Sequence, residues 1–371
     1  MRNESSLLIK LENLAYNYEL LNKLAPQNEV LFMIKANAYG NGITKIYEYA
    51  HNELGIKNFG VAALGEAQLI RLNYPKDMTN IYVFSDINFK NKDCLKLYEQ
   101  ANILPVISSR EDFDIAIKAL RSTRLVLKFN TGMNRLGLEL DDLAYYSESL
   151  KKAGKSISHL MTHYSSSYLG IERVNATKNQ YNKFKKIHDH FKSEGIEVSN
   201  TSCANSGAIE QKFSLEENFI RPGLMLYGPY SVGAFKGDQK VWDAKNINSL
   251  ETKIIKISQL KKGSPIGYGG SVLDKDYKVL TLPLGYGDGL LTYYAGASFN
   301  LEGIKAKILG RINMDLVSIG VPIDNNSLKV DNRVRLWGFE QDSIMEFSHR
   351  VKTIPYQVMC AVSSRIPRIY L

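Results

Sequence analysis

Apolar runs of strand length alternate with stretches of helical periodicity along the first part of the chain. The first such run is Val30–Ile34, five apolar residues that lead directly into Lys35. An unbroken apolar run of this length is typical of a strand covered on both faces, as in a parallel sheet. The strand–helix pattern then repeats, so that the predicted strands are 30–34, 59–62, 81–84, 103–106, 125–129, 158–162, 198–203 and 219–227. Eight strands alternating with helices predict a (β/α)8 barrel.

The helices predicted around these strands have apolar residues at helical spacing. They cover residues 13–24, 43–54, 66–72, 92–100, 112–120, 141–153 and 174–194, with a short helix after Asn205. The pattern changes after about Pro229, where short β-rich runs alternate with turns. These runs are 252–258, 278–284, 304–312, 316–321 and 332–339. We therefore expect a barrel over 11–234 and a mostly β domain formed by 1–10 and 235–371, with 6–10 as an edge strand.

Length, charge and cysteines narrow the class of protein. A chain of 371 residues has room for a barrel and a second domain. The net charge of +9 comes from scattered lysines without a nucleic-acid motif, so we expect anionic small ligands and no nucleic acid as partner. Neither a membrane-spanning segment nor a signal peptide is recognisable. The odd number of cysteines (Cys94, Cys203, Cys360) has no metal-site spacing, which predicts a cytoplasmic protein without a metal.

Lys35 is the first candidate for chemistry, because it ends the first barrel strand and precedes the small residues of KANAYG. Barrel enzymes carry their chemistry at the C-terminal ends of strands. An amine at the rim of an apolar site loses hydration, which lowers its pKa and makes it a nucleophile toward aldehydes. A lone lysine at a strand end more often extends its amine to water. Residues elsewhere in the chain are therefore needed to distinguish a catalytic lysine from an ordinary surface one.

Later loops supply groups that suit an anionic aldehyde. The run 202–207 (SCANSG) opens a helix, and Arg221 precedes Pro222 and Gly223; the last two loops of a barrel commonly hold a phosphate. His163 could stack on an aromatic ligand, and the cations Lys128 and Arg135 flank FNTGMN. Taken singly, such residues are more often a helix cap, a core or surface histidine, or a surface cation.

Eight stretches, spanning essentially the whole chain in order, resemble the alanine racemase family. They read KANAYGNG, LKFNTGMNRLG, CANSGA, RPGLMLYG, IGYGG, LPLGYGDG, GRINMD and IPYQVMCAVSSRIPRIY. The resemblance implies a pyridoxal 5'-phosphate enzyme, a cytoplasmic homodimer with shared active sites, that racemises alanine and supplies D-alanine for peptidoglycan. Racemisation needs proton removal on one face of Cα and proton return on the other, hence two bases. The resemblance assigns these roles to Lys35 and to Tyr268 of the partner subunit.

The resemblance also assigns the remaining site residues. Those implied to bind the cofactor are Lys35 (covalently), Tyr39, Arg135, His163, Asn205, Ser206, Arg221, Gly223, Leu224 and Tyr356. Arg135, Met314 and Tyr286 are implied to meet the substrate. Lys128 matches a lysine carried as a carbamate, which would orient Arg135. Arginine at the ring nitrogen cannot accept a proton, so the nitrogen would stay largely unprotonated and transamination would be discouraged.

The sequence departs from the family pattern in four places. Asn313 stands where a cysteine is frequent, and Ser202 where a histidine commonly supports Arg221. Tyr168 replaces a frequent aspartate, and Thr292 lies where an arginine usually follows GYGDG. Because this acid and base lie at the substrate entrance, a racemase for serine or another small amino acid is the main alternative to alanine.

Three further alternatives belong to other classes. A non-catalytic pyridoxal-phosphate-binding barrel generally lacks a C-terminal β domain. A decarboxylase of the same architecture is disfavoured by IGYGG and GRINMD. A nucleic-acid-binding protein would depend on charge alone. Carbon dioxide release or its absence with L-alanine distinguishes the decarboxylase from the racemase.

Overall fold

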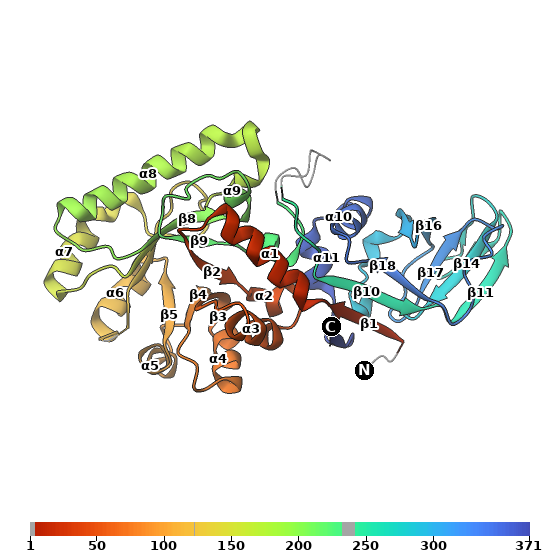
Figure 1. Cartoon of the computed structure of the whole chain (residues 1–371), viewed down its shortest axis with the longest axis horizontal. Helices are drawn as coiled ribbons and strands as arrows, with labels where there is room; N and C mark the ends of the chain where they lie inside the picture. The colour runs from red at the N-terminus through yellow and green to blue at the C-terminus, as the bar shows by residue number, and fades with distance from the viewer. Residues whose placement is uncertain (1–3, 122, 232–241) are drawn as a thin grey trace.

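The computed structural model describes residues 4–121, 123–231 and 242–371, and Figure 1 shows a barrel beside a β-rich domain. Eight parallel strands close the barrel, with β2 paired to both β3 and β9. They are β2 (Glu29–Met33), β3 (Asn58–Ala63), β4 (Asn80–Asp86), β5 (Ile103–Ile107), β6 (Val126–Lys128), β7 (His159–Met161), β8 (Thr201–Asn205) and β9 (Phe219–Arg221). The predicted (β/α)8 barrel is confirmed.

Two of the predicted strands have the wrong length. The strand predicted over 219–227 ends at Arg221, and Leu224–Tyr227 form a 3-10 helix, η3. Pro222 has no amide proton for a ladder hydrogen bond, and this ends the strand. The strand predicted from 198 begins at Thr201, and Val198 forms only an isolated bridge with Ile157.

The helices surround the barrel, and most of them bury apolar residues against it. They are α1 (Leu11–Leu24), α3 (Ile43–Asn52), α4 (Leu64–Asn73), α5 (Lys92–Gln100), α6 (Arg110–Ala119), α7 (Leu143–Ala153), α8 (Val174–Ser193) and the short α9 (Ser206–Glu210). In α8, Phe184, Ile187 and Phe191 are buried at spacings of three and four, as one helix face requires. The barrel interior holds a separate apolar cluster formed by Leu31, Tyr82, Leu104, Val106, Val126, Met161 and Phe219.

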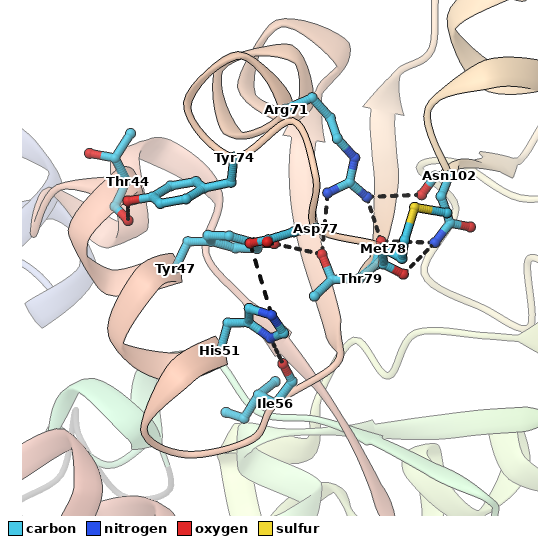
Figure 2. Close-up of polar contacts among 10 residues, drawn as sticks. All are labelled: Thr44, Tyr47, His51, Ile56, Arg71, Tyr74, Asp77, Met78, Thr79 and Asn102. Atoms are coloured by element: carbon cyan, nitrogen blue, oxygen red, sulfur yellow. Dashed lines mark hydrogen bonds and ion pairs between the residues drawn. The ribbon is translucent and has the colours of Figure 1, made fainter.

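A polar cluster ties α3 and α4 to the starts of neighbouring strands (Figure 2). The Tyr47 hydroxyl lies 2.7 Å from Thr79 Oγ1 and donates to Asp77 Oδ2 at 3.2 Å. Arg71 donates to the backbone carbonyls of Thr79, Ala101 and Asn102, which lie beside the first residues of β4 and β5. Carbonyl groups removed from water need a hydrogen-bond partner. Arg71 therefore stabilises the N-terminal ends of β4 and β5.

In its described residues, the second domain contains two sheets, a hairpin, two α-helices and two short 3-10 helices, η4 (Tyr286–Asp288) and η5 (Thr292–Tyr294). The four-stranded sheet has the order β18 (Arg333–Trp337), β10 (Asn248–Lys253), β1 (Ser5–Ile9), β19 (Arg368–Tyr370). The five-stranded sheet has the order β11 (Lys256–Leu260), β14 (Tyr277–Leu282), β17 (Val317–Val321), β16 (Ile304–Leu309), β15 (Ser298–Leu301). The hairpin pairs β12 (Pro265–Ile266) with β13 (Ser271–Val272), and the helices are α10 (Gln341–Arg350) and α11 (Pro355–Ala361).

The mostly β character of this domain is confirmed. The prediction of 6–10 as an edge strand was wrong, because β1 lies between β10 and β19 in its sheet. The run 252–258 is divided at Ile254 and Ile255 between β10 and β11, which belong to different sheets. The predicted boundary between 234 and 235 lies outside the described residues. In the part of the chain that the structure describes, no helix is long and apolar enough to cross a membrane.

Candidate active site

A cavity of about 450 Å³ lies at the C-terminal ends of the barrel strands, closed on one side by α11 of the β domain. It brings together most of the residues predicted from the sequence. These are Lys35, Tyr39, Lys128, Arg135, His163, Tyr168, Asn205, Ser206, Arg221, Gly223, Leu224 and Tyr356. The described residues that line it include no carboxylate side chain.

Lys35 leaves β2 through a left-handed turn, α2 (Lys35–Tyr39). The four residues Ala36–Tyr39 all have φ between 53° and 55°, and Gly40 has φ 82°. Left-handed backbone destabilises each L-residue by roughly 1–2 kcal/mol, so tertiary contacts must hold this turn. Sequence patterns did not predict it, because alanine and tyrosine have no preference for this conformation.

Contacts from both domains hold the turn. Glu66 at the start of α4 accepts the Asn37 amide at 3.3 Å and the Ala62 amide at 2.8 Å. From β19, Arg368 Nε donates to the Gly40 carbonyl at 3.1 Å and the Tyr370 hydroxyl to the Asn41 carbonyl at 3.0 Å. The conformation beside Lys35 therefore depends on the last strand of the chain.

Four cationic side chains, Lys35, Lys128, Arg135 and Arg221, converge on the cavity, and their charges lower the pKa values of the two lysines. Burial lowers the pKa of Lys35, and Arg135 lowers it further. Burial, with the charges of Arg135, Arg221 and Lys35, lowers the pKa of Lys128 to about 8. Burial and the same cations hold the pKa of His163 well below its usual range, so its ring is neutral. The site attracts anions and contains an amine that deprotonates more readily than a surface lysine.

Arg221, at the end of β9, is buried at 3% exposure and held from three sides. Its Nη1 donates to Ser202 Oγ at 2.6 Å, and its Nη2 donates to the carbonyls of Thr162 at 2.5 Å and Cys203 at 3.1 Å. Burial lowers its pKa to about 10, which leaves the guanidinium charged at neutral pH. Nε–H and the second Nη1–H make no hydrogen bond to the described residues, so donors remain for a ligand.

Gly223, Ser206 and Tyr39 form a tight corner of small and hydroxyl groups in the cavity wall. The Gly223 amide donates to Ser206 Oγ at 3.0 Å. A Cβ on residue 223 would lie 2.4 Å from the Tyr39 hydroxyl, so only glycine allows this approach. Tyr39 is buried and its ring lies 5.8 Å from that of Tyr356. Backbone amides and hydroxyls in such a corner suit a phosphate.

Three predicted residues do not reach this cavity within one chain. Tyr268 is 71% exposed in the β12–β13 hairpin, and Met314 and Tyr286 are exposed as well. They lie on neighbouring loops, since the Tyr286 amide donates to the Asn313 carbonyl and Gly267 lies beside Arg311. The exposed Thr292 follows the same segment. These side chains do not line the cavity of their own barrel, and their exposure allows them to contact a second molecule.

Sequence reasoning missed several residues of the site. Thr162, Tyr230 and Ser231 line the cavity, and Glu66 holds the turn of Lys35 from a helix start. Buried His159 lies beneath the cavity inside the barrel. Only His159 carried a usable signal, a polar residue at the start of an otherwise apolar strand.

The comparisons with known proteins agree over the whole chain. The model described as alanine racemase, N-terminal domain, matches residues 9–231, and alanine racemase, C-terminal domain, matches residues 247–370. The chain is 31% identical over 362 residues to an alanine racemase of Fusobacterium nucleatum (96% of this chain, 97% of that protein). It is 30% identical over 366 residues to one of Pasteurella multocida (96% of each).

Solved structures give the same result. The alanine racemase from Acinetobacter baumannii matches with a TM-score of 0.85 and 26% identity, covering 100% of both chains. The biosynthetic alanine racemase from Pseudomonas aeruginosa matches with a TM-score of 0.87 and 25% identity, again over 100% of both. Since the two domain models together span nearly all of the chain, this protein belongs to the alanine racemase family of isomerases.

Proposed function

We propose that this chain interconverts L-alanine and D-alanine with pyridoxal 5'-phosphate, as a homodimer with shared active sites. The observation that supports this most directly is the composition of the cavity. A half-buried amine with a lowered pKa lies among three further cations, and no carboxylate lines the cavity in the described part of the chain. An amine of this kind suits an aldehyde, and the surrounding charge suits a phosphate.

The residues present fit this cofactor. Lys35 would hold its aldehyde carbon, and His163 and Arg221 would meet its ring and ring nitrogen. Arg135 would approach the phenolic oxygen. The phosphate would be held by Tyr39, Ser206, Gly223, Leu224 and Tyr356, with Asn205 capping α9 by accepting the Ala208 amide at 3.2 Å. When bound, the cofactor withdraws electrons from the substrate and so acidifies its Cα proton.

The remaining chemistry belongs to the side chains. Lys35 moves a proton at one face of Cα, and Tyr268 of the partner subunit moves a proton at the other face. The exposed positions of Tyr268, Met314 and Tyr286 support this arrangement, because a site lacking its second base must borrow it. Arg135 and Met314 of the partner subunit would receive the substrate carboxylate.

Lys128 has a distinct role in the proposal. Its lowered pKa leaves part of the amine neutral near pH 8, the form that adds carbon dioxide to give a carbamate. The resulting anion would pair with Arg135 and fix its direction. Carbon-13 NMR with labelled bicarbonate tests this: a signal absent from Lys128→Met supports the modification, and identical spectra contradict it.

The activity is tested with purified protein, pyridoxal 5'-phosphate and L-alanine in deuterium oxide. We expect optical rotation to decay to zero, with deuterium at Cα and no carbon dioxide. Carbon dioxide would identify a decarboxylase, and unchanged rotation would refute racemisation. A parallel assay with L-serine tests the effect of Tyr168, and growth of a D-alanine auxotroph tests the supply of D-alanine for peptidoglycan.

Shared sites are tested by mixing two inactive variants. Lys35→Ala and Tyr268→Ala are each expected to be inactive, whereas co-expression gives heterodimers with one complete site. Random pairing predicts about a quarter of the wild-type specific activity. No recovery in heterodimers confirmed by differential tags would refute a base supplied from the partner subunit.

A further inference from the structure

We infer that His159 is a positioning residue for Arg221, acting through Ser202. This inference rests on the proposed function, because it concerns how Arg221 is presented to the cofactor. His159 lies on β7 and Ser202 on β8, both with side chains inside the barrel. Ser202 Oγ lies 2.6 Å from Arg221 Nη1 and 2.8 Å from His159 Nε2, so it joins the two side chains.

The direction of each hydrogen bond follows from counting protons. A guanidinium only donates, so Arg221 Nη1 donates to Ser202 Oγ. The Ser202 hydroxyl has one proton and is fully buried, and among the described residues its Oγ contacts only Arg221 and His159. If His159 Nε2 also donated, this proton would have no acceptor, which is unfavourable in the interior. His159 Nε2 therefore accepts from Ser202.

The tautomer of His159 is fixed by the same reasoning. A neutral imidazole that accepts at Nε2 carries its proton on Nδ1. Nδ1 lies 3.4 Å from the hydroxyl of Tyr82, the acceptor that the barrel interior provides. The groups facing the ring are Tyr82, Phe219 and, through Ser202, Arg221. Burial and the charge of Arg221 lower the pKa of His159 to about 3, in agreement with a neutral ring.

The hydrogen-bonded chain from His159 through Ser202 to Arg221, here called the relay, has a consequence for the cofactor. An accepting imidazole polarises the Ser202 hydroxyl and makes its oxygen a better acceptor for Arg221. It does so without placing an anion beside the guanidinium, so the charge of Arg221 remains available to the cavity. In this chain Ser202 replaces the histidine that commonly supports the arginine in the family. His159 on the adjacent strand β7 supports Arg221 indirectly, through its hydrogen bond with Ser202.

The test combines four variants and a matched control. His159→Leu and Ser202→Ala each break the relay, and His159→Gln retains an acceptor at a similar distance from the backbone. The fourth variant carries both His159→Leu and Ser202→Ala. The control is His190→Leu, which breaks a comparable 2.7 Å contact between His190 Nε2 and Ser147 Oγ on the outer helices.

The first measurement is the affinity of each cofactor-free variant for pyridoxal 5'-phosphate. We expect His159→Leu and Ser202→Ala each to weaken it about ten-fold, and the double variant to be no weaker than Ser202→Ala. His159→Gln and the control should stay within about two-fold of the wild type. Additive effects in the double variant, or wild-type affinity in His159→Leu, would overturn the relay.

The second measurement needs no cofactor. In protein labelled with nitrogen-15 at histidine, the ring signal lost in His159→Gln is expected to be neutral, with its proton on Nδ1, at pH 6. A protonated ring or the opposite tautomer would overturn the inference. Failure of the wild type to bind pyridoxal 5'-phosphate would instead refute the proposed function, so the two failures are distinguishable.

Discussion

Replacing Lys128 by methionine is expected to stabilise the cofactor-free protein. Lys128 is 6% exposed and faces three other cations, and its pKa is about 8 in place of 10.5. This difference corresponds to about 3 kcal/mol of destabilisation at pH 7, where the amine is charged in both states. Lys128→Met removes the charge and retains most of the apolar stem, so the variant should be more stable by up to about 3 kcal/mol.

The pH dependence gives the prediction its sign. Between pH 8 and 10.5 the unfolded chain binds more protons at Lys128 than the folded chain, so the stability of the wild type rises with pH in this window. The advantage of Lys128→Met should therefore be largest below pH 8 and shrink toward pH 10.5.

Urea unfolding of both proteins at pH 7 and pH 10, in carbonate-free buffer, measures this difference. Lys262→Met, at an exposed turn position, serves as the control and should change the free energy of unfolding little at either pH. Equal stability of Lys128→Met and the wild type at pH 7 would refute the reasoning. An advantage that grows with pH would refute it as well.

Three more substitutions test the geometry of the site. Gly223→Ala places a Cβ 2.4 Å from the Tyr39 hydroxyl. We therefore expect at least about ten-fold weaker binding of pyridoxal 5'-phosphate in an absorbance titration. Unchanged affinity would contradict the close packing of Gly223 against Tyr39. Arg221→Glu should increase the fraction of turnovers that end in pyridoxamine 5'-phosphate, measured by chromatography, because a carboxyl group can share a proton with the ring nitrogen; no increase would argue against this role. Ala36→Gly relieves a φ of 53°, because glycine adopts this conformation freely. The free energy of unfolding of the cofactor-free protein in urea should rise by about 1 kcal/mol. A loss of stability would contradict the assignment of strain.

The architecture could be predicted from the sequence where burial is simple. Strands covered on both faces often read as apolar runs, and β2 was found in this way. Alternation with helices located others, such as β8, whose predicted segment 198–203 (VSNTSC) is mostly polar. The prediction was wrong where one residue decides the end of a strand, as at Pro222. It was also wrong where one apolar run continues through two sheets, as at Ile254. Helices α10 and α11 were not predicted, because their segments were interpreted as part of a β domain.

The candidate site, like the fold, could be predicted only in part. Residues at strand ends, such as Lys35 and Arg221, were placed correctly at one cavity because parallel strands end at a common rim. The left-handed turn after Lys35 could not be predicted, since contacts distant in sequence impose it. Tyr268 lies outside the cavity of its own chain, and its role stays a prediction until subunits are mixed.

The pairing of β1 with β19 has a consequence for folding. Leu7 of β1 pairs with Arg368 of β19, so the four-stranded sheet joins residues that are far apart in the sequence. A contact between residues this far apart in the sequence closes a long loop, which makes the pairing of β1 with β19 a late step in folding. The turn that carries Lys35 is held by that same last strand. We therefore expect the turn that carries Lys35 to become rigid only after β19 has docked beside β1.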